Sequence, residues 1–89
     1  MTIIRTFELK NKLGLHARVA AKLVTVARGF KSRIYLEREG REVNGKSLLG
    51  ILTLACPQGS RVTVRAEGAD ALQAIENLEQ LFENKFGET

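Results

Sequence analysis

The sequence is poor in the residues that build disulfides, metal sites and catalytic triads. Its 89 residues include one cysteine, one histidine, one proline and no tryptophan. A lone cysteine cannot close an internal disulfide, so we expect a cytoplasmic protein in which Cys56 is a small apolar residue in the loop before Pro57. The apolar runs are far too short to cross a membrane, and no basic start leads into a long apolar stretch. We therefore expect neither a signal peptide nor a membrane partner.

Aromatic side chains are also scarce, with four phenylalanines beside the single tyrosine, Tyr35. A sheet that binds RNA stacks bases on aromatic residues at alternating strand positions, and only Tyr35 is a candidate for that role. Fourteen basic residues against ten acidic ones give a net charge of +4. This mildly basic balance permits nucleic-acid binding without indicating it, so we expect no nucleic-acid partner.

The hydrophobic pattern predicts a single α+β domain, residues 1–89. Hydrophobic residues make up 44% of the chain, and neither a repeat nor a low-complexity linker divides it. Strands are predicted at 2–9, 32–38, 41–44 and 60–66, and helices at 17–28, from Ser47 to about Leu54, and after Asp70. The residues expected to face the core are Ile3, Phe7, Leu9, Val19, Ala20, Leu23, Val24, Ala27, Ile34, Leu36, Val43, Ile51, Leu54, Val62, Val64, Ala66, Ala71, Ala74, Ile75, Leu78, Leu81 and Phe82. This order of elements implies a four-stranded sheet with helices on one face.

The only histidine lies where a loop turns into a helix. Gly14 offers a permissive backbone before the helix predicted at 17–28, which places His16 at or beside the N-cap. A helix N-terminus presents unpaired N–H groups and the positive end of the dipole, and Arg18 adds a fork of donors suited to phosphate. An imidazole can act as a nucleophile through its unprotonated nitrogen. No Asp, Glu, Cys or second His lies nearby in sequence to form a triad, so we expect neither a triad nor a metal site here.

The run from Leu13 to Leu23 resembles the active-site segment of HPr, the histidine-containing phosphocarrier of the sugar phosphotransferase system. The family pattern is Gly, a branched apolar residue, His, Ala or Thr, Arg, Pro, Ala, and this chain matches it except at Val19, where proline is usual. Proline in the first helical turn presets φ and gives up no needed hydrogen bond. Valine has neither of these properties, so we expect a less preorganised helix start. The rate of phosphoryl transfer or the preferred partner should then differ from those of the family.

A second segment, from Val43 to Leu52, resembles the regulatory serine region of the same family. Asn44 and Gly45 form a turn signal, and Ser47 is a good N-cap for a short helix. In HPr proteins of the Gram-positive type the matching serine is phosphorylated by a dedicated kinase. The resemblance therefore makes Ser47 a candidate switch for a serine kinase/phosphorylase, a role compatible with capping because a helix end accommodates phosphate.

The short helix after Ser47 is apolar on more than one side, and a surface helix of a small domain cannot bury every leucine. Ile51 and Leu54 are the expected core members, while Leu48, Leu49 and Leu52 match the docking patch of the family. Basic residues expected around this patch would suit an acidic, partly apolar partner. The predicted docking residues are Lys22, Arg28, Lys46, Leu48, Leu49 and Leu52.

The resemblance covers essentially the whole chain and implies an antiparallel open-faced β-sandwich whose first and fourth strands are neighbours. It implies a phosphocarrier, not an enzyme: His16 takes a phosphoryl group on Nδ1 from phosphorylated enzyme I and passes it to an EIIA-type acceptor. Monomer is the default expectation for the oligomeric state. Phosphoenolpyruvate is the ultimate donor, Arg18 and the amides of Ala17 and Arg18 stabilise the group, and no cofactor or metal is needed. The alternatives are a regulatory paralogue of the nitrogen-related branch and, more distantly, a small RNA- or protein-binding module in which His16 only caps a helix.

Overall fold

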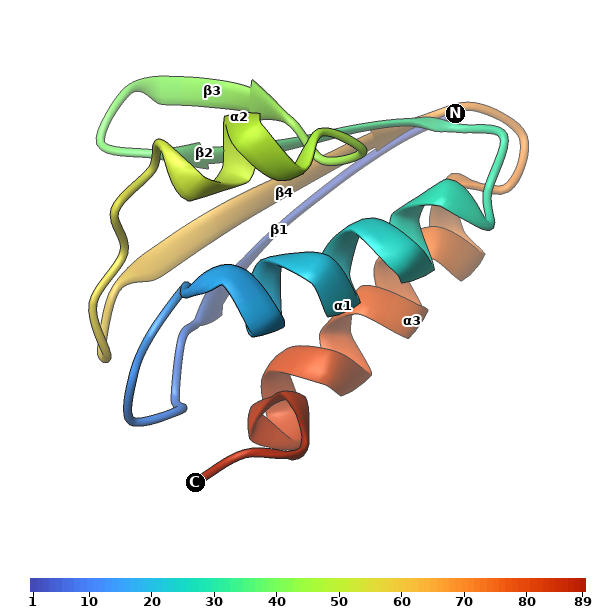
Figure 1. The fold of residues 1–89 in the computed structure, drawn as a ribbon. Coiled ribbons are helices and arrows are strands. Elements are labelled where there is room, and N and C mark those ends of the chain that lie inside the picture. The colour runs from blue at the N-terminus through green and yellow to red at the C-terminus, as the bar shows by residue number, and fades with distance from the viewer.

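A computed structural model describes all residues, 1–89, and contains the predicted order of strands and helices (Figure 1). The elements are β1 (Thr2–Glu8), α1 (Ala17–Arg28), β2 (Arg33–Arg38), β3 (Arg41–Asn44), α2 (Leu48–Leu52), β4 (Arg61–Glu67), α3 (Ala71–Glu83) and a short 3-10 helix (Lys85–Gly87). The predicted bounds of α1 and β3 are confirmed. Strands β1 and β2 differ from the prediction by one residue at one end, β4 is shifted by one residue at both ends, and the 3-10 helix was not predicted.

The four strands form one antiparallel sheet in the order β1-β4-β2-β3, so the first and fourth strands are neighbours as the family resemblance implied. On one edge of β4, Val62 pairs with Phe7 of β1, and on the other edge Val64 pairs with Leu36 of β2. Strand side chains alternate between faces, so these apolar residues share the face that the helices cover. Ile3 is only partly buried there, and Arg5, which interrupts the apolar alternation of β1, reaches Glu79 of α3 at 3.1 Å.

The core lies between this face of the sheet and the two long helices, α1 and α3, which contact one another. Every predicted core residue of α1 is buried, and Val19 is fully inaccessible. In α3 the buried stripe is Ala71, Ala74, Ile75, Leu78 and Phe82. Leu81 is a correction to the predicted stripe, because it lies at the margin of the packed face and is only partly buried. The predicted open-faced α+β sandwich is confirmed.

Helix α2 is shorter than predicted, because it ends at Leu52. Ser47 caps it as expected, its hydroxyl accepting a hydrogen bond from the Gly50 amide at 3.1 Å. The amides of Thr53 and Leu54 bond to carbonyls three residues back, which tightens and closes the last turn. Ala55 then adopts a left-handed φ of 51°. Leu54 is buried as predicted, but it reaches the core from this turn.

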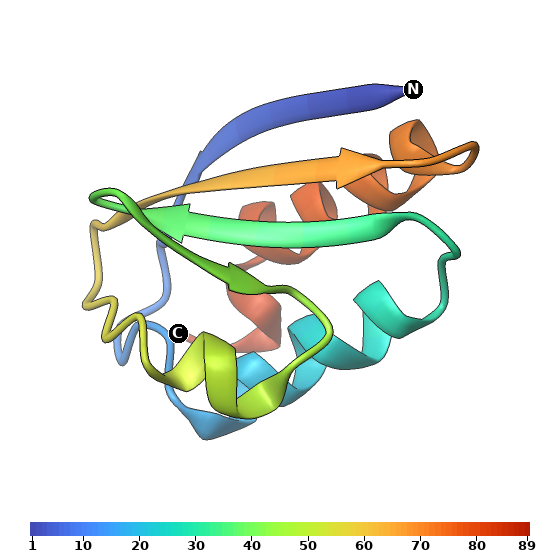
Figure 2. The ribbon, with the colours of Figure 1, turned by 90° about the horizontal axis from the view of Figure 1, so that it is seen from above.

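The opposite face of the sheet carries no helix (Figure 2). Tyr35, the single aromatic candidate for base stacking, lies under the guanidinium of Arg65, which is 4.2 Å from the ring centroid. Arg65 in turn pairs with Glu42 at 2.8 Å. One face of the Tyr35 ring is therefore already covered by a paired cation. No helix is both long and apolar enough to cross a membrane.

The start of α3 is tied to the loop that precedes β2. Asp70 is the residue before α3, yet its carboxylate does not cap its own helix. It accepts hydrogen bonds from the Lys31 amide at 2.8 Å, the Ser32 amide at 2.9 Å and the Ser32 hydroxyl. The Ser32 hydroxyl, followed by the Lys31 amide, holds the pKa of Asp70 below its usual value. The Asp70 carboxylate therefore joins the loop between β4 and α3 to the loop between α1 and β2.

Candidate functional site

The loop before α1 is fixed by its contact with the loop before β4. Gly14 has a left-handed φ of 69°, and a Cβ atom there would lie 2.3 Å from the carbonyl oxygen of Cys56. The Leu15 amide donates to that same oxygen at 2.8 Å, and the side chain of buried Asn11 donates to the Gly14 carbonyl at 2.7 Å. The turn that was predicted in front of His16 therefore has a single tightly packed conformation.

His16 is the N-cap of α1, as predicted, with an extended backbone (φ −92°, ψ 177°). Its side chain makes no capping hydrogen bond to the helix, so the ring is available for other contacts. Twenty-six per cent of the side chain is exposed. The first amides of the helix, including those of Ala17 and Arg18, lack a carbonyl partner within it. An anion beside His16 thus meets free donors and the positive end of a twelve-residue helix.

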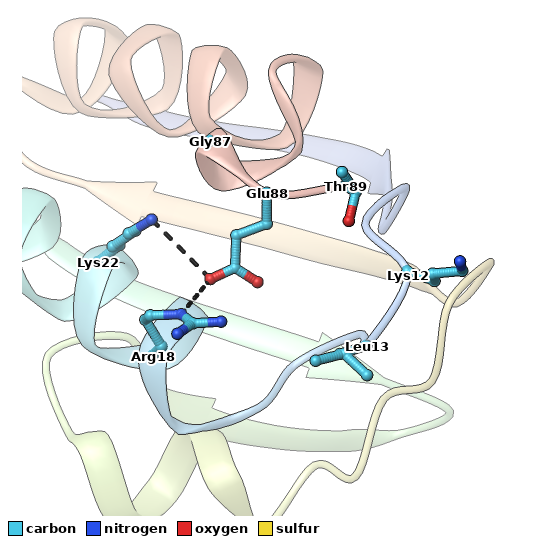
Figure 3. Close-up of a pocket in the computed structure, with 7 residues that line it drawn as sticks. All are labelled: Lys12, Leu13, Arg18, Lys22, Gly87, Glu88 and Thr89. Carbon is cyan, nitrogen blue, oxygen red and sulfur yellow. Dashed lines mark hydrogen bonds and ion pairs between the residues drawn. The ribbon is translucent and has the colours of Figure 1, made fainter.

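No carboxylate lies near His16 in sequence, but the fold brings one to it. Glu88, 72 residues away in sequence, places its Oε1 atom 2.7 Å from Nε2 of His16. Its Oε2 atom accepts a hydrogen bond from Nε of Arg18 at 2.5 Å. Figure 3 shows the Glu88 carboxylate between the 3-10 helix and the first turns of α1. No local pattern predicts this contact, because it depends on where α3 ends and how the chain folds back.

The charge around this carboxylate is predominantly positive. Lys22 Nζ lies 4.0 Å from Oε2 of Glu88 and donates to the Phe86 carbonyl at 2.6 Å. A hollow here is lined by Lys12, Leu13, Arg18, Lys22, Gly87, Glu88 and Thr89. The hydrogen bond from Arg18, and to a smaller extent that from His16, holds the pKa of Glu88 below its usual value. The hollow therefore has one negative side chain among three cations, which suits a further anion.

The predicted docking residues lie on α1, on α2 and just before α2, and these two helices contact one another. Leu49 is 78% exposed and Leu48 is 40% exposed. Leu52 is a partial correction, because it packs against the core and is only partly buried there. Leu48 and Leu49 are therefore the apolar residues that this surface offers to a partner.

The predicted basic docking residues are held by backbone carbonyls. Arg28 Nε donates to the Lys46 carbonyl at 3.2 Å, and Lys46 Nζ donates to the Phe30 carbonyl at 2.7 Å. Lys22 is tied to the Phe86 carbonyl. These contacts restrict the side chains of all three cations, so their positions are set by the fold. They also hold the segment that precedes Ser47 against the end of α1.

Cys56 is almost fully buried, and its thiol lies 3.7 Å from the Leu54 carbonyl. Burial raises the pKa of this thiol, which disfavours the reactive thiolate. Its backbone carbonyl, by contrast, contributes to the site by receiving the Leu15 amide. No group of three or more His, Cys, Asp or Glu side chains is arranged to hold a metal ion.

Known proteins resemble this chain over nearly its whole length. A family model described as PTS HPr component phosphorylation site matches residues 3–84. The phosphocarrier protein HPr of Xylella fastidiosa is 50% identical over 78 residues, which are 88% of each chain. The multiphosphoryl transfer protein of Haemophilus influenzae is 43% identical over 97% of this chain and 18% of that protein. A crystal structure of HPr-C-His from Thermoanaerobacter tengcongensis has a TM-score of 0.94, with 47% identity and 98% coverage of both chains.

Proposed function

The chain belongs to the HPr phosphocarrier family of the phosphotransferase system, and on this basis we propose that His16 accepts a phosphoryl group from phosphorylated enzyme I and passes it to an EIIA-type protein. Phosphoenolpyruvate is the ultimate donor. The observation that carries the proposal is His16 at the N-cap of α1, beside Arg18 and the free first-turn amides. The protein is then a substrate of phosphotransferases, acting in the cytoplasm without a cofactor.

Transfer needs a nucleophile and a place for negative charge. The Nδ1 atom of His16 makes no hydrogen bond, so no protein group occupies the position from which it would attack phosphorus. The phosphoryl oxygens then lie at the N-terminus of α1, where the amides of Ala17 and Arg18 and the terminal nitrogens of Arg18 can donate to them. Fixed donors of this kind stabilise a transferring phosphoryl group without reorganising.

The docking surface consists of Lys22, Arg28, Lys46, Leu48, Leu49 and Leu52. Exposed Leu48 and Leu49 beside fixed cations favour a partner surface that is apolar at its centre and acidic at its edge. We expect enzyme I and the EIIA-type acceptor to use this same surface in turn, because each must bring its own reacting group to His16. Leu52 contributes from the margin of the patch.

Ser47 is a second, regulatory site in this proposal. Its hydroxyl caps α2 directly before Leu48 and Leu49, so a phosphate on it would add charge at the edge of the docking surface. A serine kinase/phosphorylase would then control docking without touching His16. The resemblance of the segment from Val43 to Leu52 to the regulatory serine region of the family supports this role.

One residue favours a second candidate function, a regulatory paralogue of the nitrogen-related branch. Val19, where the family usually has proline, is fully buried in the first turn of α1. Its side chain packs in the core, so its difference from proline lies in the freedom of the backbone at the helix start and not in the exposed surface. The rates of phosphoryl uptake from a sugar-branch and a nitrogen-branch enzyme I would distinguish the two candidate functions.

The decisive experiment is incubation with phosphoenolpyruvate and enzyme I, followed by measurement of protein-bound phosphate. The expected product is one acid-labile, alkali-stable phosphate in the wild type and none in His16→Ala. A wild type that takes up no phosphate from enzyme I of either branch contradicts the phosphocarrier function. Equal labelling of His16→Ala and the wild type would mean that another residue is phosphorylated, which contradicts the assignment of His16 as the acceptor.

A further inference from the structure

Glu88 is bound to both functional side chains of the site through its two carboxylate oxygens. Oε1 lies 2.7 Å from Nε2 of His16, and Oε2 lies 2.5 Å from Nε of Arg18. Only 12% of the Glu88 side chain is exposed. Glu88 also lies outside residues 3–84, which the family model matches, so the shared family pattern assigns it no role.

An ionised carboxylate can accept hydrogen bonds but cannot donate one. The contacts with Arg18 and His16 lower the pKa of Glu88, so at neutral pH its side chain is an acceptor only. The nitrogen that faces it, Nε2 of His16, must then carry a proton. A neutral imidazole has a single N–H, so Nδ1 keeps its lone pair.

The same carboxylate leaves the phosphate-binding atoms of Arg18 free. It accepts a hydrogen bond from Nε, while the two terminal nitrogens make no hydrogen bond to Glu88. Arg18 is 67% exposed, so those nitrogens face the open hollow. In Figure 3 the carboxylate approaches the guanidinium from the side of the tail. One side chain therefore orients the nucleophile and the anion-binding group together.

The tail that carries Glu88 is anchored on both sides of this residue. Phe86 is buried, with its ring 5.1 Å from that of Phe82, and its carbonyl accepts the Lys22 ammonium at 2.6 Å. On the other side, the Lys12 amide donates to the Thr89 carbonyl at 2.6 Å. In Figure 2 the C-terminus lies beside the loop between β1 and α1. The carboxylate is thus held at the site by contacts that do not involve His16.

We propose that Glu88 is a positioning residue for phosphoryl transfer, which holds the proton of His16 on Nε2 so that Nδ1 is the nucleophile. This inference rests on the proposed function and deepens it. It assigns a role to a residue far from the histidine motif in sequence, and it explains why the carboxylate contacts the ring at Nε2.

The transfer then needs no proton to move. The lone pair of Nδ1 forms the bond to phosphorus while the bond from phosphorus to the donor breaks, and that electron pair leaves with the donor. The ring, still protonated at Nε2, becomes a cation, and the negative charge of Glu88 stabilises it. In the onward step the bond from Nδ1 to phosphorus breaks, and its electron pair returns to the ring.

The test compares Glu88→Ala with Glu76→Ala, which removes an exposed carboxylate from α3 away from the site. The first measurement is the ¹⁵N NMR spectrum of the His16 ring in the unphosphorylated protein, in alkaline buffer where imidazole is neutral. The wild type and Glu76→Ala should carry the ring proton on Nε2 only. Glu88→Ala should show a measurable population with the proton on Nδ1.

The second measurement is the single-turnover rate of phosphoryl uptake from phosphorylated enzyme I. Loss of a hydrogen bond to a charged group predicts a rate about tenfold lower in Glu88→Ala than in Glu76→Ala. An unchanged ring tautomer, or an uptake rate equal to or above that of the control, would overturn the proposal. The NMR measurement uses no phosphate, so it separates this inference from a failure of the proposed function, in which the wild type itself takes up no phosphate.

Discussion

Gly14 and Cys56 meet at the base of the histidine loop, with the Cys56 carbonyl oxygen where a side chain on Gly14 would have to stand. This contact joins the loop before α1 to the loop before β4. The oxygen also receives the Leu15 amide. The position of His16 therefore depends on a residue 40 positions further along the chain.

Gly14→Ala should lower the free energy of unfolding and slow phosphoryl uptake. A left-handed residue with a side chain costs about 1–2 kcal/mol, and the overlap with the Cys56 carbonyl adds to this. The control is Gly40→Ala, which has a φ of 83° but open space around it. We expect Gly14→Ala to be less stable than Gly40→Ala by at least about 1 kcal/mol in chemical denaturation. Equal stability and equal uptake rates would show that the contact is unimportant.

Alanine substitutions at Leu49 and Ile51 should distinguish a residue that docks partners from one that packs in the core of the protein. Leu49 is 78% exposed, so Leu49→Ala should change the free energy of unfolding by less than about 0.5 kcal/mol. Uptake from enzyme I should nevertheless slow by roughly tenfold if this side chain is central to docking. Ile51 is fully buried, and Ile51→Ala should cost about 2–5 kcal/mol. A normal uptake rate in Leu49→Ala would remove Leu49 from the docking surface.

Aspartate at position 47 should preserve the stability of the fold but weaken docking to enzyme I. Ser47→Ala removes the hydroxyl that accepts the Gly50 amide and should cost about 1 kcal/mol of stability. Ser47→Asp keeps a good capping group, so its stability should stay near that of the wild type. Its negative charge beside Leu48 should weaken docking to enzyme I and raise the concentration needed for half-maximal uptake. Unchanged transfer kinetics in Ser47→Asp would contradict the regulatory role.

Val19 is the position at which to test the departure from the family pattern. Val19→Ala should lower the free energy of unfolding by about 2 kcal/mol, because two buried methyl groups are lost. Val19→Pro keeps a similar apolar volume and removes an amide that has no partner within the helix, so its cost should be smaller. Uptake rates of the wild type and Val19→Pro, measured with enzyme I of each branch, show whether proline changes the preferred donor. Identical rates would mean that Val19 has no bearing on the branch.

Asp70 should give the fold a defined dependence on pH. The Ser32 hydroxyl and the Lys31 amide lower its pKa in the folded chain. Such a carboxylate stabilises the fold above the pKa of the unfolded chain, and this stabilisation is lost as the pH falls through the lower, folded-state pKa. Asp70→Asn should therefore be less stable than the wild type at neutral pH and should lose less stability in acid. Glu76→Gln, on an exposed part of the same helix, should follow the wild-type pH profile.

The sequence predicted those features that depend on neighbouring residues. The spacing from Val19 to Ala27 predicted α1 to the residue, and with Gly14 it placed His16 at the N-cap. The length of α2 was wrong because the tight turn at Thr53 and the left-handed Ala55 leave no trace in hydrophobic spacing. Glu88 was missed because its contact joins residues 72 positions apart, and long-range contacts of Phe86 and Thr89 determine where that tail lies.

The pairing of β1 with β4 and the return of the tail to His16 have a consequence for synthesis. A ribosome that has made the first eighty residues has produced the histidine and both motifs, yet neither Phe86 nor Glu88. The nascent chain thus contains the acceptor before it contains the carboxylate that orients it. The full rate of phosphoryl uptake should therefore appear only once the turn beyond α3 has left the ribosome and packed against the first turns of α1.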